Sequence, residues 1–197
     1  MPRVVIATRN PGKAKELETL LAGIAASFES LARHPDLRLP PEGESSYAEN
    51  ALAKARAVRA ALGVAAVGDD SGLEVDSLGG APGIRSARYA GEDAGDRENN
   101  ARLLDALREV PSGRRTARFR CALALVDSNG SEEVVEGTCE GRVLDAPRGT
   151  GGFGYDPLFL PEGETRTFAE LPESRKDSIS HRGRAAAALR EALKARR

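Results

Sequence analysis

The order of predicted elements in this 197-residue chain indicates an α/β protein, with a mixed (α+β) sheet flanked by helices. Two observations lead to this prediction. Apolar, β-branched runs alternate with helix-like segments over the first half of the chain, which is typical of parallel βα units. Two longer strand candidates then follow each other across a short polar turn, which is typical of an antiparallel hairpin. Parallel and antiparallel pairing in one chain favours a mixed sheet with helices packed on it.

The first half of the chain is expected to supply the βα units. Its predicted elements, in order, are a strand over residues 3–8, a helix over 14–21, a short strand near 27–30, a helix over 47–62 and a buried strand over 65–68. The second helix is the best marked, because Ser46 and Glu49 form a capping box at its start. A Pro-rich loop over 34–44 precedes it. The buried strand is expected to end at Asp69, where an Asp-Asp-Ser-Gly sequence begins.

The second half is expected to supply the hairpin. Its predicted elements, in order, are a helix over 96–109, strands over 117–127 and 132–143, a short apolar stretch over 155–160 and a final helix over about 181–195. Ser128, Asn129 and Gly130 join the two strands with residues that favour a hairpin turn. Glycine-rich passages over 79–83 and 149–154 are expected to be loops.

Length and composition limit the class of protein. The chain is long enough for one well-buried domain, or for two lobes that share a cleft. Its net charge of -1 lacks the basic field that nucleic-acid binders usually carry. No apolar run reaches the ~20 residues of a membrane span, and the N-terminus lacks the layout of a signal peptide, so we expect a cytoplasmic protein. Cys121 and Cys139 lack a CxxC spacing and are expected to be reduced packing residues.

The first loop, from Ile6 to Ala14, has the arrangement of a phosphate-binding loop. A strand leads through a Pro-Gly turn into a helix, whose first backbone N–H groups point outward and can receive phosphate. The P-loop signature begins with glycine and ends with a serine or threonine that binds the metal. Ala7 and Ala14 stand at these two positions. Because alanine offers no oxygen to Mg2+, metal ligands must come from elsewhere in the chain.

Carboxylates in two other segments can supply these ligands. Adjacent residues of a strand point to opposite faces, so we expect different roles for Asp69 and Asp70. The alternative is an Asx-type turn that only ends the strand. Glu42 and Glu44 lie in the Pro-rich loop. Either can complete a site for Mg2+, which is often held by one or two carboxylates together with substrate phosphates.

Lys54 lies four residues after Asn50 on the long predicted helix, so the two side chains share one face. Most helix lysines are solvated, and that is the alternative here. The other interpretation is that Lys54 points toward the same site as the carboxylates and contributes to phosphate binding.

The loop over 149–157 and the start of the last helix are candidates for base recognition. Glycines around Phe153 allow the backbone to approach a ligand, and the ring offers a face on which a nucleobase can stack. The alternative is an ordinary turn with a core phenylalanine. Lys176, His181 and Arg182 gather hydrogen-bond donors, which suit a keto oxygen and disfavour an amino group. The alternative there is a helix cap with a solvated arginine.

Six motifs, in this order, resemble those of the inosine/xanthosine triphosphate pyrophosphatases, which remove deaminated purine nucleotides. They are Thr8-x-Asn10-x-x-Lys13, Glu49-Asn50-Ala51 with Lys54, Asp69-Asp70-Ser71-Gly72-Leu73, the segment from Gly79 to Tyr89, Gly151-Gly152-Phe153-Gly154-Tyr155-Asp156-Pro157, and Ser180-His181-Arg182-Gly183. No single motif is decisive, but six in register over nearly the whole chain make a chance match implausible.

The resemblance implies a Mg2+-dependent enzyme that hydrolyses ITP, dITP and XTP at the α-phosphorus, giving the monophosphate and pyrophosphate. It implies Asp70 as catalytic base and metal ligand, and Glu42 as second metal ligand with Glu44 as its competitor. The substrate-binding residues that it implies are Thr8, Arg9, Asn10, Pro11, Gly12, Lys13, Lys54, Ser71, Phe153, Gly154, Tyr155, Asp156, Lys176, His181 and Arg182.

The resemblance also implies an architecture and an assembly: an elongated mixed β-sheet flanked by helices, two lobes with a cleft between them in a single domain over 1–197, and a homodimer. Two other functions are weighed against this one. The first is a regulatory module that binds nucleotides without hydrolysis. The second is a degenerate P-loop phosphohydrolase that releases orthophosphate, which Ala7 and Ala14 disfavour. The charge balance and the 4% aromatic content disfavour a nucleic-acid partner.

Overall fold

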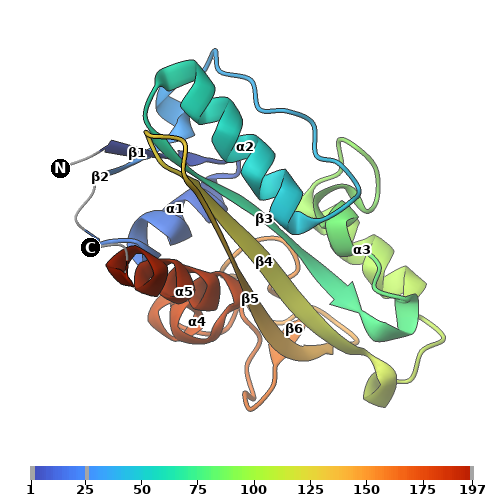
Figure 1. Ribbon diagram of the computed structural model, residues 1–197. Coiled ribbons are helices and arrows are strands. Elements are labelled where there is room, and N and C mark those ends of the chain that lie inside the picture. Colours follow the sequence, from blue (N-terminus) through green and yellow to red (C-terminus); the bar gives the residue numbers. More distant parts are fainter. Residues whose placement is uncertain (1–2, 25–26, 196–197) are drawn as a thin grey trace. The chain divides into compact units, whose positions relative to one another are not determined.

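The computed structural model describes residues 3–24 and 27–195, which form a six-stranded sheet with helices around it (Figure 1). The strands are β1 (Arg3–Ala7), β2 (Ser27–Ser30), β3 (Ala65–Val75), β4 (Thr116–Val126), β5 (Glu132–Val143) and β6 (Phe159–Pro161). The helices are α1 (Pro11–Leu20), α2 (Tyr47–Leu62), α3 (Asp96–Ala106), α4 (Glu173–Ile179) and α5 (His181–Ala195). The strand order is β2-β1-β3-β4-β5-β6, with β1 parallel to β2 and β3, and β6 antiparallel to β5. The predicted mixed sheet flanked by helices is confirmed.

The chain divides into two compact units. The first unit comprises the residues up to Asp70, Cys121–Gly137 and the residues from His181 onward. The second unit comprises Ser71–Arg120 and Thr138–Ser180. Strands β3, β4 and β5 contribute residues to both units, and each unit has hydrophobic clusters of its own.

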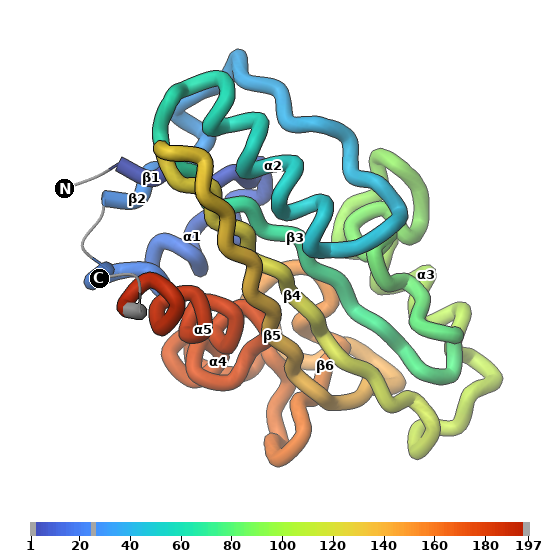
Figure 2. The backbone as a smooth tube through the Cα atoms, viewed as in Figure 1, coloured from blue at the N-terminus to red at the C-terminus, as the bar shows by residue number. Residues whose placement is uncertain are grey.

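In the first unit, neighbouring residues of β1 belong to cores on opposite faces of the sheet, as the alternation of a strand requires. Ile6 packs in one cluster with Leu17 of α1 and Leu189 of α5. These two helices lie side by side (Figure 1, Figure 2). Val5 packs in a second cluster with Val58 of α2. The first unit therefore has α1 and α5 on one face of its strands and α2 on the other.

Two glycines let helices approach these strands closely. A Cβ atom at Gly68 of β3 would lie 2.0 Å from the carbonyl oxygen of Ala51 in α2. A Cβ atom at Gly137 of β5 would lie 2.1 Å from the carbonyl oxygen of His181, where α5 begins. A side chain at either position would push the helix outward. The two glycines thereby set the depth of α2 and α5, the helices that carry candidate site residues.

The second unit is built on an aromatic core. The rings of Phe119 and Phe159 pack edge to face with centroids 4.8 Å apart, and Phe168 lies 5.1 Å from Phe159. Leu73 of β3 and Leu103 of α3 belong to the same cluster. Helix α3 is therefore anchored to the strands of its own unit through this core.

The structure differs from the predicted elements at several places, and three of these differences concern candidate site residues. Strand β3 does not end at Asp69 but continues through Asp70 to Val75, because nearby cations, described below, neutralise both buried carboxylates. Helix α1 begins at Pro11 rather than at residue 14, because proline suits the first helical turn and Asn10 caps it. Helix α4, which carries Lys176, is absent from the predicted elements.

Candidate active site

The first loop is closed by its own side chains before α1 begins. The Asn10 N–H donates to Thr8 Oγ1 at 3.2 Å, and the Lys13 N–H donates to Asn10 Oδ1 at 3.0 Å. Pro11 and Gly12 form the first residues of the helix. The loop therefore presents an ordered helix N-terminus, whose partial positive charge favours an anion.

Asp69 lies at the centre of a buried series of ion pairs. Its carboxylate accepts a hydrogen bond from Arg182 Nε at 2.8 Å and lies 2.7 Å from Lys13 Nζ. Arg182 Nη1 also lies 2.5 Å from Glu16 Oε2 of α1. The Asp69 and Arg182 side chains are 0% and 1% exposed, so water screens their charges poorly. Charges of alternating sign thus connect Glu16, Arg182, Asp69 and Lys13.

The charges around Asp69 decide its protonation. Burial raises the pKa of the Asp69 carboxyl, but the positive charges of Arg182 and Lys13 outweigh it and hold that pKa well below its usual range. Cys121 Sγ donates to Asp69 Oδ2 at 3.3 Å, and burial raises the pKa of this thiol well above its ordinary value. Cys121 is a free buried cysteine, as predicted, and it contacts the ionised carboxylate as a neutral thiol.

Asp70 has its partners on the other side of β3. Its Oδ2 accepts a hydrogen bond from Asn50 Nδ2 at 2.9 Å, and its Oδ1 lies 3.0 Å from Lys54 Nζ. Both partners belong to α2, whereas the charged partners of Asp69 belong to α1 and α5. The prediction that the adjacent acids face opposite sides of the strand is confirmed by these contacts.

Glu42 of the Pro-rich loop reaches the same lysine. Its Oε1 lies 2.5 Å from Lys54 Nζ. Asn50 fastens this loop, since its side-chain amide donates to the Gly43 carbonyl at 3.1 Å and accepts from the Gly43 N–H at 2.8 Å. The structure therefore brings the carboxylates of Glu42 and Asp70 to one ammonium group, and Asn50 links the loop to the strand.

This arrangement shifts two pKa values. Burial raises the pKa of Asp70, and the charges of Lys54 and Lys13 offset this only in part, so its pKa stays above the ordinary value. Burial lowers the pKa of Lys54, but Asp70 and Glu42 outweigh it and raise that pKa. Among the described residues, no group of three or more His, Cys, Asp and Glu side chains is placed to hold a metal ion. Within the described ranges, the carboxylates that gather here number two, those of Asp70 and Glu42, and both contact Lys54.

The side chain of Arg9 is directed to backbone carbonyls. Its guanidinium donates to the carbonyls of Leu31, His34 and Pro35 at 3.2, 2.8 and 3.3 Å, and also to that of Leu37. These residues lie at the end of β2 and the start of the Pro-rich loop. Arg9 thus connects the first loop to the segment that leads to Glu42.

In the second unit, Lys176 and Phe153 gather around Asp156. Asp156 Oδ2 lies 2.5 Å from Lys176 Nζ and accepts the Phe153 N–H at 2.9 Å. The ammonium lies 4.9 Å from the centre of the Phe153 ring and 5.5 Å from that of Phe168, within the range of a cation–π interaction. The unit therefore combines a buried ion pair with an aromatic ring on a loop.

The glycine-rich loop fits closely onto its own carboxylate. A Cβ atom at Gly152, where φ is +71°, would lie 2.0 Å from Asp156 Oδ2. The Tyr155 hydroxyl donates to the Ser86 carbonyl at 2.8 Å, and burial raises its pKa. The glycines thus serve the internal packing of the loop, and Tyr155 anchors the loop in the core of its unit.

The remaining predicted site residues are Ser71 in β3 and His181 and Arg182 at the start of α5. Ser71 follows Asp70 directly within β3. His181 is the first residue of α5, and it is 4% exposed. Arg182, the next residue, is buried among carboxylates rather than solvated, so the alternative of a solvated arginine is wrong.

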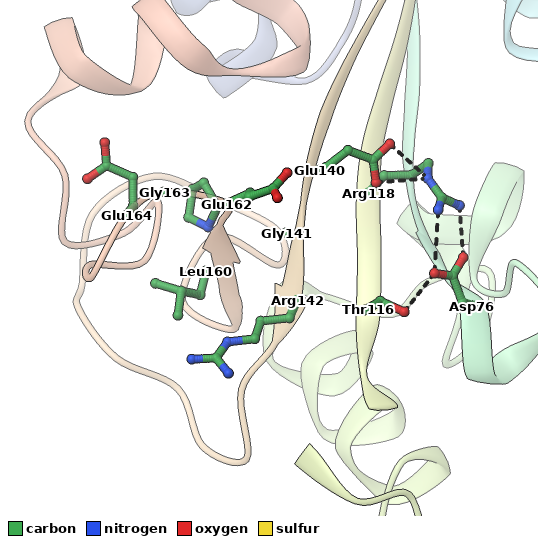
Figure 3. Close-up of a pocket in the computed structure, with 11 residues that line it drawn as sticks. Asp76, Thr116, Arg118, Glu140, Gly141, Arg142, Leu160, Glu162, Gly163 and Glu164 are labelled. Carbon is green, nitrogen blue, oxygen red and sulfur yellow. Dashed lines mark hydrogen bonds and ion pairs between the residues drawn. The ribbon is translucent and has the colours of Figure 1, made fainter. Parts of the chain in front are cut away.

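A separate hollow of about 570 Å³ lies in the second unit, over β4, β5 and β6 (Figure 3). On one wall, Arg118 pairs with Asp76 at 2.9 Å and with Glu140 at 3.1 Å, and Thr116 donates to Asp76 at 2.7 Å. Arg142 extends from β5 along another part of it. None of its lining residues is a predicted site residue, so this hollow does not belong to the predicted chemistry.

Several residues in contact with the predicted site residues have no assigned role in the sequence prediction. Glu16 lies three residues after Lys13 on the same helix, and helical periodicity is a signal that would have marked it. The role of Asp69 depends on Arg182, which is 113 positions away in the chain. No local pattern reveals a partner at that separation.

Comparisons with known proteins agree with one another. A model of the Ham1 family matches residues 4–192. A dITP/XTP pyrophosphatase from Geobacter sulfurreducens is 48% identical over 193 residues, which cover 98% of this chain and 97% of the relative. A dITP/XTP pyrophosphatase from Frankia alni is 51% identical over 200 residues, covering 97% of this chain and 98% of the relative.

Solved structures are similar over the same length. A HAM1 protein from Coxiella burnetii superimposes with a TM-score of 0.87 at 37% identity, covering 98% of this chain and 99% of that one. A nucleoside-triphosphatase / dITP/XTP pyrophosphatase from Mycobacterium abscessus gives a TM-score of 0.75 at 46% identity, covering 95% of this chain and 97% of that one. Fold and sequence similarity therefore extend over nearly all of both chains.

Proposed function

This chain belongs to the Ham1 family, and from that premise we propose that it hydrolyses the non-standard purine triphosphates ITP, dITP and XTP to the nucleoside monophosphate and pyrophosphate. The activity named for its relatives, dITP/XTP pyrophosphatase, supports this reaction. One observation carries the proposal. Asp70 and Glu42 converge on Lys54 in the same unit as the Thr8–Lys13 loop.

We assign Asp70 and Glu42 as the residues that hold Mg2+. The donor set fits, because Mg2+ is often held by one or two carboxylates plus substrate phosphates, and these two oxygens already converge on one cation. The contact with Lys54 supports Glu42 over Glu44 as the second ligand. When bound, Mg2+ would neutralise phosphate charge and lower the pKa of a water molecule.

Asp70 is the general base of the proposed reaction. It takes a proton from the water that attacks the α-phosphorus, and pyrophosphate leaves. A raised pKa brings its proton affinity closer to neutral pH, which favours this role. Asn50 orients the carboxylate through its hydrogen bond to Oδ2. No covalent intermediate is required.

The first loop and its lysine bind the phosphates. The N-terminus of α1, which Thr8 and Asn10 order from within the loop, favours the anion through its partial positive charge. Lys13 stabilises charge that develops on the leaving pyrophosphate. Arg182 neutralises Asp69 from the other side, so Lys13 keeps positive charge for the phosphates. The guanidinium of Arg9 is bound to backbone carbonyls. Arg9 therefore contributes to phosphate binding through its place in the backbone of the first loop and not through its side chain.

The base is recognised by residues of the glycine-rich loop and by Lys176. A purine stacks on Phe153, and Lys176, held by Asp156, donates to a keto oxygen. An amino group at the same place would meet another donor, which is costly when desolvated. His181 and Arg182 stay predicted base contacts, and Ser71 a predicted substrate contact.

The assembly and location stay predictions drawn from the family resemblance and the composition. We propose a homodimer in the cytoplasm. In the described part of the chain, none of the helices combines the length and the apolar character that a membrane crossing requires.

A panel of nucleoside triphosphates tests the proposal. The protein is incubated with Mg2+ and ITP, dITP, XTP, ATP or GTP, and pyrophosphate and orthophosphate are measured separately. We expect pyrophosphate from ITP, dITP and XTP and at least tenfold lower rates from ATP. A preference for ATP would overturn the assignment of the base-recognition residues.

The same panel separates the alternatives. Release of orthophosphate alone would indicate a P-loop type of phosphohydrolase. Tight ITP binding with no product would indicate a regulatory nucleotide-binding module. Either result refutes the proposed reaction.

A further inference from the structure

The loop that presents Phe153 is fastened from α3. The Gly154 N–H donates to Asp96 Oδ2 at 2.6 Å, and the Gly154 carbonyl accepts from Asn100 Nδ2 at 2.8 Å. Asp96 and Asn100 lie four residues apart on α3, so their side chains share one face of the helix. Both polar backbone groups of Gly154 are therefore held by one helix face, and all of these residues belong to the second unit.

The neighbouring backbone groups are bonded as well. The Phe153 N–H donates to Asp156 Oδ2 at 2.9 Å, and the Asp156 N–H donates to the Phe153 carbonyl at 3.2 Å. Gly154 has a φ of +59°, a left-handed conformation that favours glycine. Because each polar backbone group of Phe153 and Gly154 has a partner, the backbone from which the Phe153 ring projects is held in one conformation.

Both hydrogens on the amide nitrogen of Asn100 are used by this arrangement. Its Nδ2 donates to the Gly154 carbonyl and to the Asp96 carbonyl, both at 2.8 Å. An aspartate at position 100 has nearly the same shape but would place a carboxylate against two carbonyl oxygens. The fastening therefore depends on the chemical nature of this side chain and not only on its size.

We infer that Asp96 and Asn100 are positioning residues for base recognition, which hold Gly154 so that the Phe153 ring keeps the direction in which a purine stacks on it. The inference rests on the proposed function and extends it to α3, a helix that contributes no predicted substrate contact. It assigns these residues to affinity for the base and not to affinity for the triphosphate, which residues of the first unit bind.

The test compares a ligand that has a base with one that lacks it. Asn100→Asp is assayed for kcat and KM with ITP, and for inhibition by inorganic tripolyphosphate. We expect KM for ITP to rise about tenfold, because base stacking on an aromatic ring contributes substantially to binding. The inhibition constant for tripolyphosphate and kcat at saturation stay within about twofold. Arg97→Ala, an exposed position on the same helix, is the control and leaves all three unchanged.

Every outcome decides the inference. An unchanged KM for ITP in folded Asn100→Asp overturns it, and so does an equal weakening of tripolyphosphate, which a general loss of structure produces. If Asn100→Asp does not fold, Asp96→Ala takes its place with the same criteria. Wild-type protein that forms no pyrophosphate from ITP refutes the proposed function instead. Calorimetric binding of inosine then decides the inference by itself, with about tenfold weaker binding expected in the variant.

Discussion

The two units hold their candidate functional residues by different means. In the first unit, Asp69 and Lys54 are each contacted by two groups of opposite charge. In the second unit, the backbone of Phe153 and Gly154 is held by hydrogen bonds, and Gly152 fits against a carboxylate without room for a Cβ atom.

This difference matches what each unit is proposed to bind. Ion pairs redistribute when a charged ligand arrives, because Lys54 and Arg182 each contact two carboxylates between which their charge is shared. Backbone hydrogen bonds and close packing fix a direction, which a stacking ring requires. Electrostatic neutralisation therefore suits the polyphosphate, and a rigid loop suits the uncharged base.

The largest expected effect comes from removing the proposed base in the first unit. Asp70→Asn keeps the shape of the side chain but cannot accept the proton from water. We expect pyrophosphate release from ITP to fall by about 10²- to 10⁴-fold, while ITP binding measured by calorimetry stays within about threefold. Near-normal turnover would remove Asp70 from its proposed role.

The second effect tests how the first unit depends on charge. Asp69→Asn leaves Arg182 and Lys13 without the buried carboxylate that they share, which we expect to lower the free energy of unfolding by about 3–5 kcal/mol. Lys13→Met is the comparison, because Asp69 then keeps Arg182, and we expect a loss of about 1.5 kcal/mol. Urea denaturation measures both. Equal losses of unfolding free energy in Asp69→Asn and Lys13→Met would show that Arg182 does not compensate the charge of Asp69 once Lys13 is removed.

The third effect tests how the second unit depends on backbone fit. Gly152→Ala places a Cβ atom 2.0 Å from Asp156 Oδ2 at a φ of +71°, and we expect a loss of about 2–4 kcal/mol from overpacking plus conformational strain. Gly163→Ala is the matched control, since its φ is +80° with nothing within 4 Å of the added atom. It carries the conformational cost alone, about 1 kcal/mol. The same loss in both variants would contradict close packing at Gly152.

The smallest effect is the pH dependence of the first unit. The pKa of Asp69 is lowered in the folded state, so its contribution to stability is present above its unfolded pKa of about 3.9 and is lost as pH falls below that value. We expect a loss of about 1.3 kcal/mol from this group at pH 3.

The raised pKa of Asp70 acts with the opposite sign, so its unfavourable contribution disappears on acidification. The difference in unfolding free energy between wild type and Asp69→Asn, measured by urea denaturation at pH 7 and pH 3, isolates Asp69. This difference should narrow at pH 3. A constant difference would mean that folding does not lower the pKa of Asp69.

Local patterns predicted most of the elements, and four of them with the bounds that the structure has. The strands over 27–30 and 132–143 and the helices over 47–62 and 181–195 are confirmed without a shift, because capping residues, turn residues and apolar runs mark their ends. The error at Asp69 has a clear cause. Two acidic residues in succession indicate a turn unless cations are close, and those cations come from distant segments.

The candidate site shows the same limit. The sequence identified Lys13, Lys54 and Asp70 as charged groups with chemistry to perform, but gave no partner to Asp69 and no link between α3 and Gly154. Asn100 and Gly154 are 54 positions apart, and only the packing of α3 on the core of its unit places them together.

The amino-acid sequence alone predicts the succession of elements, the family resemblance and the groups available for phosphate, metal and base chemistry. Which cation neutralises which carboxylate, and which helix face holds the Phe153 loop, depend on the folded chain. The difference is one of range. Propensity, capping and periodicity act over a few residues, whereas an ion pair or a fastening hydrogen bond forms between whichever groups the packing of helices on strands brings within about 3 Å.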